Sequence, residues 1–270
     1  MSSRVLKRGE IIPLEKRSTI SLRYRSVTKA INKEFYNSQS ETANSRYVGS
    51  YGRGTAIDTS DIDILVELPQ QEYERFDNAR GNGQSRLLQA VKEAISVTYP
   101  RSDIRADGQV VKIAFSDGIR FEILPAFKNY DFWGNWDGTY IYPDTNMGGN
   151  WCSTNPIAEQ NAMKEKNDSS NGLLYDTCKH LRFVRDQKYK SYHLSGIVID
   201  SFIYQAIGNW SWALEGNSGS AAPGTFERSL LEYFERFKSI SYLTAPGSGQ
   251  VVDVESNIIC LEKVLKHIAE

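Results

Sequence analysis

The chain has 270 residues, of which 40% are hydrophobic and 24% charged, and its formal net charge is −1 with a pI of about 6.4. This composition is ordinary for a globular protein with a core, and the length suits one large domain or two small ones that share a cleft. Proteins that grip duplex nucleic acid usually carry a basic surface, and the overall charge does not indicate one. Residues 1–30 are a local exception with eight basic and two acidic residues. We interpret them as a solvated helix face or as a segment that attracts phosphates.

Cysteine spacing and hydropathy exclude several classes of protein. Cys152, Cys178 and Cys260 lie far apart and form no Cys-X-X-Cys pair, so neither a disulfide framework nor a zinc site follows from them. The chain shows no N-terminal apolar segment of the secretory kind and no run of roughly 18 apolar residues. We therefore expect a cytoplasmic protein with no membrane partner, and we expect it to be a monomer.

The first part of the chain shows helical and strand patterns in turn. An apolar stripe that includes Ile20, Val27 and Ile31 predicts a helix over about residues 18–37. A segment rich in Gly, Ser and Thr follows, and it ends in a run that predicts a strand over 62–68. A second apolar stripe predicts a helix over about 84–98.

A β-hairpin is predicted next. Two β-rich runs, 110–115 and 119–124, flank the pair Asp117-Gly118, and Asp-Gly between such runs is a strong hairpin signal. We expect Pro125 to end the second strand, because proline has no N–H to donate to a sheet.

The composition changes after residue 128. Residues 129–156 are rich in aromatics, Gly and Asn, and we expect an ordered connection whose tryptophans pack between two lobes. Beyond it the sequence predicts helices only, with Gly/Ser-rich breaks between the later ones. We therefore expect a mixed α/β domain over 1–130 and a helical lobe over 131–270, with helices at about 172–187, 196–210, 225–240 and 255–268.

Three carboxylates carry the predicted chemistry. Asp61 and Asp63 stand two residues apart on a predicted strand, so they point to the same face of the sheet. Glu122 lies on the second strand of the hairpin and can stand beside them if that strand pairs with theirs. Gly49 and Ser50 precede Asp61 in a turn-rich segment whose backbone N–H groups can approach phosphate oxygens.

These carboxylates suit a divalent cation. Three of them converging on one point would repel each other without one, and Mg²⁺ prefers oxygen ligands. Two Mg²⁺ ions about 3.5–4 Å apart suit an in-line displacement at phosphorus. Mn²⁺ is an alternative ion. A separate interpretation stays open for Glu122, namely that it is a cross-strand partner of Arg120 or Lys112.

The chain resembles a known family at these residues. The run GSYGRGT from Gly49 to Thr55, followed by SDID from Ser60 to Asp63, is similar to the signature of polymerase-β-like nucleotidyltransferases. More narrowly, the chain resembles the CD-NTases, bacterial relatives of cyclic GMP-AMP synthase and oligoadenylate synthase. The narrower resemblance rests on FEILPAF from Phe121 to Phe127, on Tyr142-Pro143-Asp144, Trp151 and Thr154-Asn155-Pro156, on Lys179, and on Ser191-Tyr192 at a helix start.

The resemblance implies a fold and roles for individual residues. The fold is α+β, a polymerase-β-like palm with a small mixed sheet and helices, plus a helical lobe across the active-site cleft. The implied roles are triphosphate binding by Gly49 and Ser50, Mg²⁺ binding by Asp61, Asp63 and Glu122, phosphate contact by Lys179 and Ser191, and stacking of Tyr192 on a nucleobase. For Arg53 two interpretations stay open, namely that it contacts phosphate and that it does not. The chain departs from the family at Glu122, where Asp is usual, and at Leu181, where Trp is frequent.

The implied function is synthesis of a cyclic di- or oligonucleotide from NTPs, with pyrophosphate release, in CBASS-type anti-phage signalling. A regulatory partner protein is possible, and no long nucleic acid is strongly implied. Two alternatives remain open from the residues. One is nucleotidyl transfer to RNA, protein or a small molecule, and the other is a non-catalytic nucleotide-binding protein.

Overall fold

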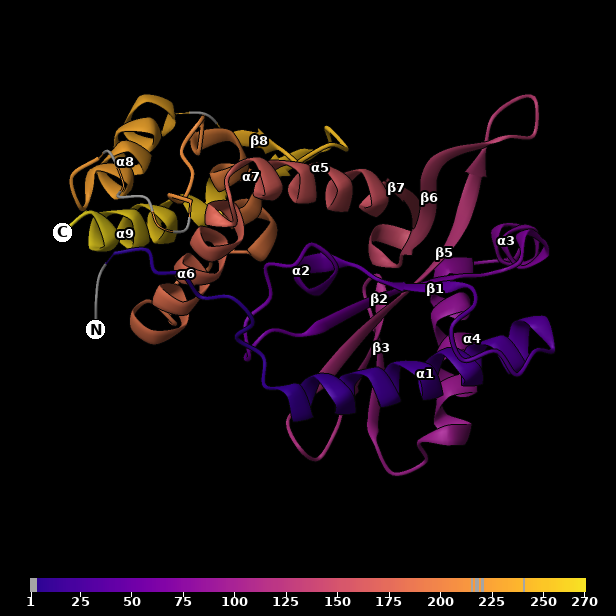
Figure 1. The fold of residues 1–270 in the computed structure, drawn as a ribbon. Coiled ribbons are helices and arrows are strands. Elements are labelled where there is room, and N and C mark those ends of the chain that lie inside the picture. Colours follow the sequence, from indigo (N-terminus) through magenta and orange to yellow (C-terminus); the bar gives the residue numbers. More distant parts are fainter. Residues whose placement is uncertain (1–3, 215, 217–218, 220, 240) are drawn as a thin grey trace. The chain divides into compact units, whose positions relative to one another are not determined.

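The structure is a computed structural model that describes residues 4–214, 216, 219, 221–239 and 241–270 (Figure 1). The chain divides into two compact units. The first, the sheet unit, comprises Ile12–Gly52 and Ser60–Pro156; the second, the helical unit, comprises Met1–Ile11, Arg53–Thr59 and Ile157–Glu270. Compared with the expected boundary at residue 130, residues 1–11 and 53–59 fall with the helical unit and residues 131–156 with the sheet unit.

The sheet unit is built on one mixed sheet. Its main path runs in the order β1-β2-β5-β4-β3, and β6 and β7 extend it from β5. Of the pairings along this path, β2 with β5 is parallel and the others are antiparallel. The strands are β1 (Ser45–Tyr47), β2 (Ile62–Glu67), β3 (Asp103–Asp107), β4 (Val110–Ala114), β5 (Arg120–Tyr130), β6 (Trp136–Asp144) and β7 (Asn150–Thr154).

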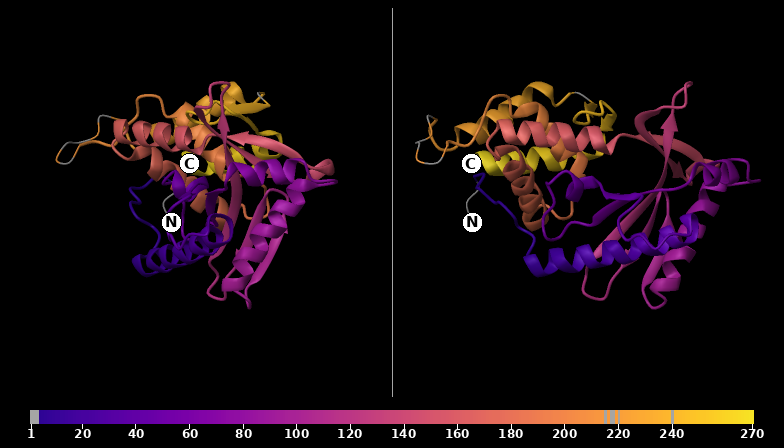
Figure 2. Two further views of the ribbon diagram at one scale, coloured as in Figure 1. Left: turned by 90° about the vertical axis from the view of Figure 1, so that its right-hand side faces the viewer. Right: turned by 45° about the vertical axis from the view of Figure 1, so that its right-hand side comes forward.

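Three longer helices and one short turn accompany the sheet: α1 (Leu14–Tyr36), α2 (Gly49–Gly52), α3 (Gln70–Asp77) and α4 (Gly83–Thr98). The helices predicted over 18–37 and 84–98 are confirmed as α1 and α4. The apolar stripe of α1 is buried at Ile20, Val27 and Ile31, and the side chain of Asn82 caps α4 by accepting from the Ser85 N–H. The helix α4 packs against α1 and along β3, β4, β5 and β6 (Figure 2).

The predicted hairpin is confirmed, but its second strand is longer than expected. The strands β4 and β5 meet at a turn in which Gly118 has a φ of +84° and the Phe115 N–H donates to Ile119 O at 3.0 Å. The prediction that Pro125 ends the strand is wrong, because β5 continues to Tyr130. Pairing with β4 runs to Ile123 and pairing with β6 begins at Phe127, so the missing N–H of Pro125 interrupts neither ladder.

The expected connection over 129–156 is instead the hairpin of β6 and β7. Its strand pattern was hidden because Asp137, Gly138 and Pro143 are residue types that strands usually avoid. The expected packing of tryptophans between lobes is also corrected. Trp151 packs on Phe127 inside the sheet unit, with ring centroids 5.7 Å apart, and Trp133 is 81% exposed.

The helical unit contains five α-helices among its described residues and a short β-hairpin. The helices are α5 (Pro156–Ser169, whose first residue belongs to the sheet unit), α6 (Leu173–Lys188), α7 (Gly196–Ala206), α8 (Thr225–Phe237) and α9 (Ile258–Ala269). The expectation of helices only is wrong, because β8 (Tyr242–Thr244) pairs with β9 (Val251–Asp253). Strands of three residues are too short to show an alternating pattern in the sequence.

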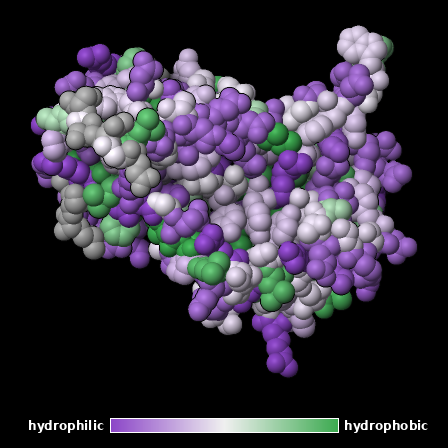
Figure 3. Space-filling view, viewed as in Figure 1, coloured by the Kyte–Doolittle hydropathy of each residue, from purple (hydrophilic) through white to green (hydrophobic). Residues whose placement is uncertain are grey.

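The core of the helical unit is apolar and continuous. It is formed by buried residues of α6, α7, α8 and α9, among them Leu181, Ile203, Leu230 and Leu265. Cys178 and Cys260 are free thiols, and both are buried. Among the described residues, none of the helices has the length and apolar character needed to cross a membrane. On the face drawn in Figure 3, hydrophobic residues are scattered between hydrophilic ones.

Candidate active site

The strand β2 presents its carboxylates on one face of the sheet. Ile62 and Ile64 are 2% and 0% exposed and point into the core of the sheet unit. Successive residues of an extended chain alternate between faces, so Asp63 of β2 and Asp61, one residue before the strand, fall on the other side. The predicted shared face of the two aspartates is therefore present in the structure.

The parallel pairing of β2 with β5 brings Glu122 beside Asp63. In the register of this pair Asp63 lies opposite Glu122, with Ile62 opposite Phe121 and Ile64 opposite Ile123. The apolar partners are all buried, which fixes the register, because a slip of one residue would turn them to the other face. Asp63 and Glu122 thus lie on neighbouring strands and on the same face, and Asp61 directly precedes β2.

Two basic side chains stand among these carboxylates. Arg120 Nε donates to Asp61 Oδ1 at 2.6 Å, and Lys112 Nζ lies 2.7 Å from Asp107 and 3.5 Å from Glu122. The hydrogen bond that Lys112 donates to Asp107 raises the pKa of Lys112, and the charge of Glu122 adds to this effect. The cross-strand pairing of Glu122 with Lys112, left open from the sequence, is therefore present. The pairing of Arg120 with Asp61 was not predicted, although Arg120 lies two residues before Glu122 on the same strand face.

The fit to a metal ion follows from the donor set. Carboxylate oxygens are the ligands that Mg²⁺ prefers, and the side chains of Asp61 and Glu122 are 41% and 31% exposed, so solvent ions can reach them. Among the described residues no three acidic, His or Cys side chains are gathered closely enough to hold an ion. Asp61 and Glu122 are instead paired with the basic side chains Arg120 and Lys112 in this conformation.

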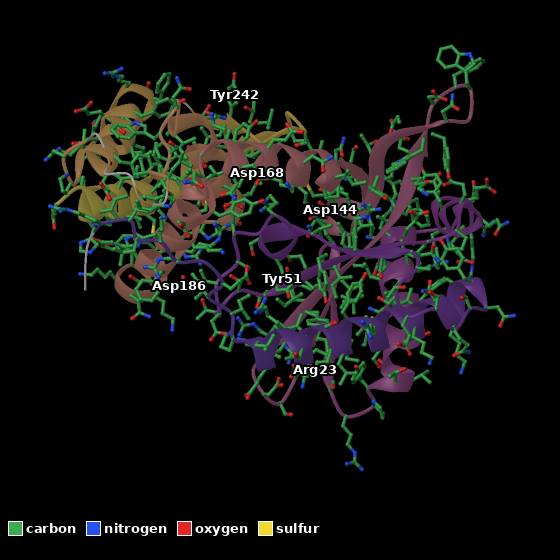
Figure 4. The ribbon with its side chains drawn as sticks, viewed as in Figure 1. Arg23, Tyr51, Asp144, Asp168, Asp186 and Tyr242 are labelled. Carbon is green, nitrogen blue, oxygen red and sulfur yellow. The ribbon has the colours of Figure 1, made fainter. Side chains whose placement is uncertain are left out.

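The turn α2 packs directly on Asp63. Gly49 has a φ of +57°, and a Cβ built on it would lie 1.8 Å from Asp63 Oδ2. The Val48 N–H donates to Asp63 O, and the Gly52 N–H donates to Val48 O, both at 2.9 Å. Both the backbone conformation and the close approach require glycine at position 49. The predicted triphosphate residues Gly49 and Ser50 thus begin a turn in contact with one of the predicted metal ligands, and Tyr51 of the same turn is labelled in Figure 4.

The three other predicted nucleotide residues belong to the helical unit. Lys179 of α6 is buried at 7% exposure, its Nζ donates to Gly9 O at 2.6 Å, and burial lowers its pKa. Ser191 and Tyr192 were expected at a helix start, but they lie in the turn before α7, whose N-cap is Ser195. Tyr192 is 42% exposed, and Lys263 Nζ lies 4.9 Å from the centre of its ring.

Arg53 occupies a buried ion network of the helical unit. Its guanidinium donates to Asp200 at 2.9 Å and to Glu159 at 2.8 Å. No local pattern indicates these partners, which lie 147 and 106 residues away along the chain. Arg53 thus has buried carboxylate partners that were not predicted, and its contact with phosphate stays a prediction.

Comparisons with known proteins identify the family of this chain. The family model described as Second Messenger Oligonucleotide or Dinucleotide Synthetase domain (SMODS) matches residues 7–167, more than half of the chain. A search among curated proteins finds no match.

Solved structures show the same fold. The Elizabethkingia meningoseptica CdnE cyclic dinucleotide synthase with GTP and Apcpp is similar with a TM-score of 0.65 at 14% identity, over 98% of this chain and 94% of that one. A mutant of the Vibrio cholerae di-nucleotide cyclase (DncV) has a TM-score of 0.64 at 11% identity, over 97% and 88%. The Escherichia coli MS115-1 CdnC:HORMA-deltaN complex has a TM-score of 0.54 at 13% identity, over 96% and 82%.

The predicted fold, family and enzyme class are confirmed by the family match and by these structures. Enzymes of this group are metal-dependent nucleotidyltransferases that make second messengers. With its family model matched over more than half of its length, the chain belongs to the SMODS family of second messenger oligonucleotide or dinucleotide synthetases within the polymerase-β-like nucleotidyltransferases.

Proposed function

We propose that this chain joins two or more NTPs into a cyclic di- or oligonucleotide at the face that carries Asp61, Asp63 and Glu122, as a second messenger in CBASS-type anti-phage signalling. The observation that carries the proposal is the β2–β5 register, which sets Asp63 opposite Glu122 while the turn at Gly49 packs on Asp63. A triphosphate turn and a carboxylate pair in contact are what a nucleotidyl transfer needs at one place.

Asp61, Asp63 and Glu122 would hold two Mg²⁺ ions, with Mn²⁺ as a substitute. When bound, such ions activate a hydroxyl, neutralise the triphosphate and stabilise the leaving pyrophosphate. For these ions to bind, Arg120 and Lys112 have to release Asp61 and Glu122. Both basic side chains are about half exposed, so their ion pairs are weak enough for that exchange.

The chain's own residues would bind and orient the nucleotides. Gly49 and Ser50 lie in a turn that begins with glycine, and backbone N–H groups in such a turn can approach phosphate oxygens closely. Glu122 would accept the proton of the attacking ribose hydroxyl. In the helical unit, Lys179 and Ser191 would contact phosphate, and the exposed ring of Tyr192 would stack on a base.

A cyclic dinucleotide requires two transfers, and each further nucleotide in the ring adds one. A ribose hydroxyl of one nucleotide attacks the α-phosphorus of another, a new P–O bond forms, and the bond to the β-phosphate breaks with release of pyrophosphate. The linear product then reorients, and a second transfer of the same kind closes the ring. Each transfer releases one proton and one pyrophosphate.

The test is an incubation of the purified chain with Mg²⁺ and all four NTPs, repeated with Mn²⁺ and with each NTP omitted. Products are treated with phosphatase and analysed by mass spectrometry. We expect a phosphatase-resistant species with the mass of a cyclic di- or trinucleotide, and the omissions identify its bases. Linear, phosphatase-sensitive products alone would contradict ring closure. Transfer that needs an added RNA, protein or sugar would contradict the NTP acceptor.

A further inference from the structure

The segment Arg53–Thr59 separates the two motifs of the proposed site. The turn Gly49–Gly52 and the carboxylates Asp61 and Asp63 belong to the sheet unit, whereas Arg53–Thr59 belongs to the helical unit. The chain therefore leaves the sheet unit directly after the turn and returns directly before the first aspartate. Contacts that fix Arg53–Thr59 therefore also constrain the backbone at its two ends, next to the turn and next to Asp61.

Asp200 of α7 holds the beginning of the segment. Its carboxylate is completely buried, and its Oδ2 accepts from Arg53 Nε at 2.9 Å and from Thr55 Oγ1 at 3.0 Å. Its Oδ1 accepts from Arg182 Nη1 at 2.7 Å. Arg53 also donates to Glu159, which lies three residues after the next passage of the chain into the helical unit, at Pro156.

This network is costly to break. A buried carboxylate is stable only when it is paired and hydrogen-bonded. Burial by itself would raise the pKa of Asp200, but the positive charges of Arg182 and Arg53 hold that pKa below its ordinary value. Asp200 is therefore ionised in the folded protein, and loss of either guanidinium would leave a buried charge partly uncompensated.

The rest of the segment is held as well. Gly54 has a φ of +77°, and a Cβ on it would lie 2.6 Å from the ring of Tyr175, so the backbone lies against α6. At the far end, Thr59 Oγ1 donates to Asp186 Oδ2 at 2.7 Å, and Asp186 lies on α6 in Figure 4. The segment is thus bonded near its beginning and at its last residue.

We propose that Asp200 and Arg53 are positioning residues for nucleotide binding, because they anchor the first residue after the Gly49–Gly52 turn and so fix the conformation in which the turn meets the triphosphate. This inference rests on the proposed function of the turn. In this proposal neither Asp200 nor Arg53 contacts substrate. Both act on the turn through the peptide bond between Gly52 and Arg53. Arg182 shares Asp200 but otherwise donates to Cys178 O and Gly196 O, which lie outside the segment, so it serves the stability of the helical unit.

The test compares Arg53→Met and Thr55→Val with Arg182→Met as the matched control. All three remove a donor to the same carboxylate, but only the first two release the segment. Hydrogen exchange of the Gly52 amide, which donates to Val48 O, reports the turn directly. The second readout is the Kd of a non-hydrolysable NTP analogue, and the urea unfolding midpoint of each variant accounts for global stability.

We expect Arg53→Met to speed exchange at Gly52 and to weaken analogue binding by about tenfold each, as the loss of a charged hydrogen bond predicts. Thr55→Val should have a smaller effect in the same direction, and Arg182→Met should leave both readouts at wild-type values. Equal effects of Arg53→Met and Arg182→Met, or unchanged exchange in Arg53→Met, would overturn the proposal. A wild-type chain that binds no NTP would overturn the proposed function, whereas the exchange at Gly52 would still decide whether Arg53 anchors the turn.

Discussion

An ion pair of the sheet unit and an ion network of the helical unit differ in how far they are buried. In the sheet unit, Asp61 and Arg120 form an ion pair whose side chains are 41% and 56% exposed. In the helical unit, the side chains of Asp200, Arg53 and Arg182 are 0%, 8% and 2% exposed. The distances are similar, at 2.6 to 2.9 Å, so geometry alone does not distinguish the two sets.

The difference in burial decides what each set is suited for. An exposed ion pair contributes about 0–1 kcal/mol, because water and salt screen it, so its members exchange partners readily. Removing one member of a buried pair costs about 3–5 kcal/mol, because the remaining charge stays out of water. The exposed carboxylates therefore suit a site that has to admit ions and substrate, and the buried network suits a fixed anchor.

The largest expected effect concerns the exposed carboxylates. Asp61→Asn combined with Asp63→Asn should lower pyrophosphate release by on the order of a thousandfold, because the charges that would bind the metal ions are lost. The fold should persist, since both residues stand on the face opposite Ile62 and Ile64. Activity and the thermal unfolding midpoint are measured together, with Asp103→Asn on β3 as an exposed control. Retention of more than a small fraction of activity by the double variant would show that the site is elsewhere.

The comparison is sharpened by replacing one buried and one exposed ion-paired aspartate of the helical unit. Asp200→Asn should lower the free energy of unfolding by about 3 kcal/mol, because Arg53 and Arg182 lose a buried counter-charge. Asp168→Asn, which breaks an exposed pair with Lys164 on α5, should change it by less than about 0.5 kcal/mol (Figure 4). Urea unfolding followed by tryptophan fluorescence measures both. Similar losses in the two variants would mean that burial does not separate the two sets.

A smaller effect on activity is expected where the turn meets a carboxylate. Gly49→Ala should lower turnover by about a hundredfold, because its Cβ would displace Asp63 Oδ2 and strain the turn. Gly134→Ala is the matched control, since Gly134 also has a positive φ, of +79°, but its Cβ would meet open space. Equal losses in both variants would show that backbone strain alone is responsible.

Much of the sheet unit was predictable because its signals are local. The apolar stripes of α1 and α4, the Asp-Gly turn and the alternation around Asp63 all lie within short windows of sequence. The adjacency of Glu122 and Asp63 needed one further assumption, that the hairpin pairs with β2. The register bears that assumption out.

What could not be predicted depends on contacts between distant residues. The partners of Arg53 lie more than 100 residues away, and a single sequence does not indicate which charges are buried together. Lys179 and Gly9 are 170 residues apart in the sequence, so the hydrogen bond between them could not be predicted for the same reason. The strands β6 and β7 were missed for a different reason, because tertiary pairing overrode the poor strand propensity of Asp137, Gly138 and Pro143.

The smallest expected effect tests whether the exposed ion pair gives way to a metal ion. Arg120→Gln removes the guanidinium that holds Asp61 Oδ1, so the carboxylate no longer has to be released before an ion binds. The Kd for Mn²⁺, followed by electron paramagnetic resonance of the free ion, should fall by about twofold to fivefold, the range that a weak exposed pair allows. Arg105→Gln, which breaks an exposed pair with Asp103 on β3, should leave the Kd unchanged. A higher Kd in Arg120→Gln would mean that Arg120 supports metal binding instead of competing with the ion for Asp61. The exposed pair of Asp61 and Arg120 would then not be an exchangeable set of charges, in contrast to our interpretation.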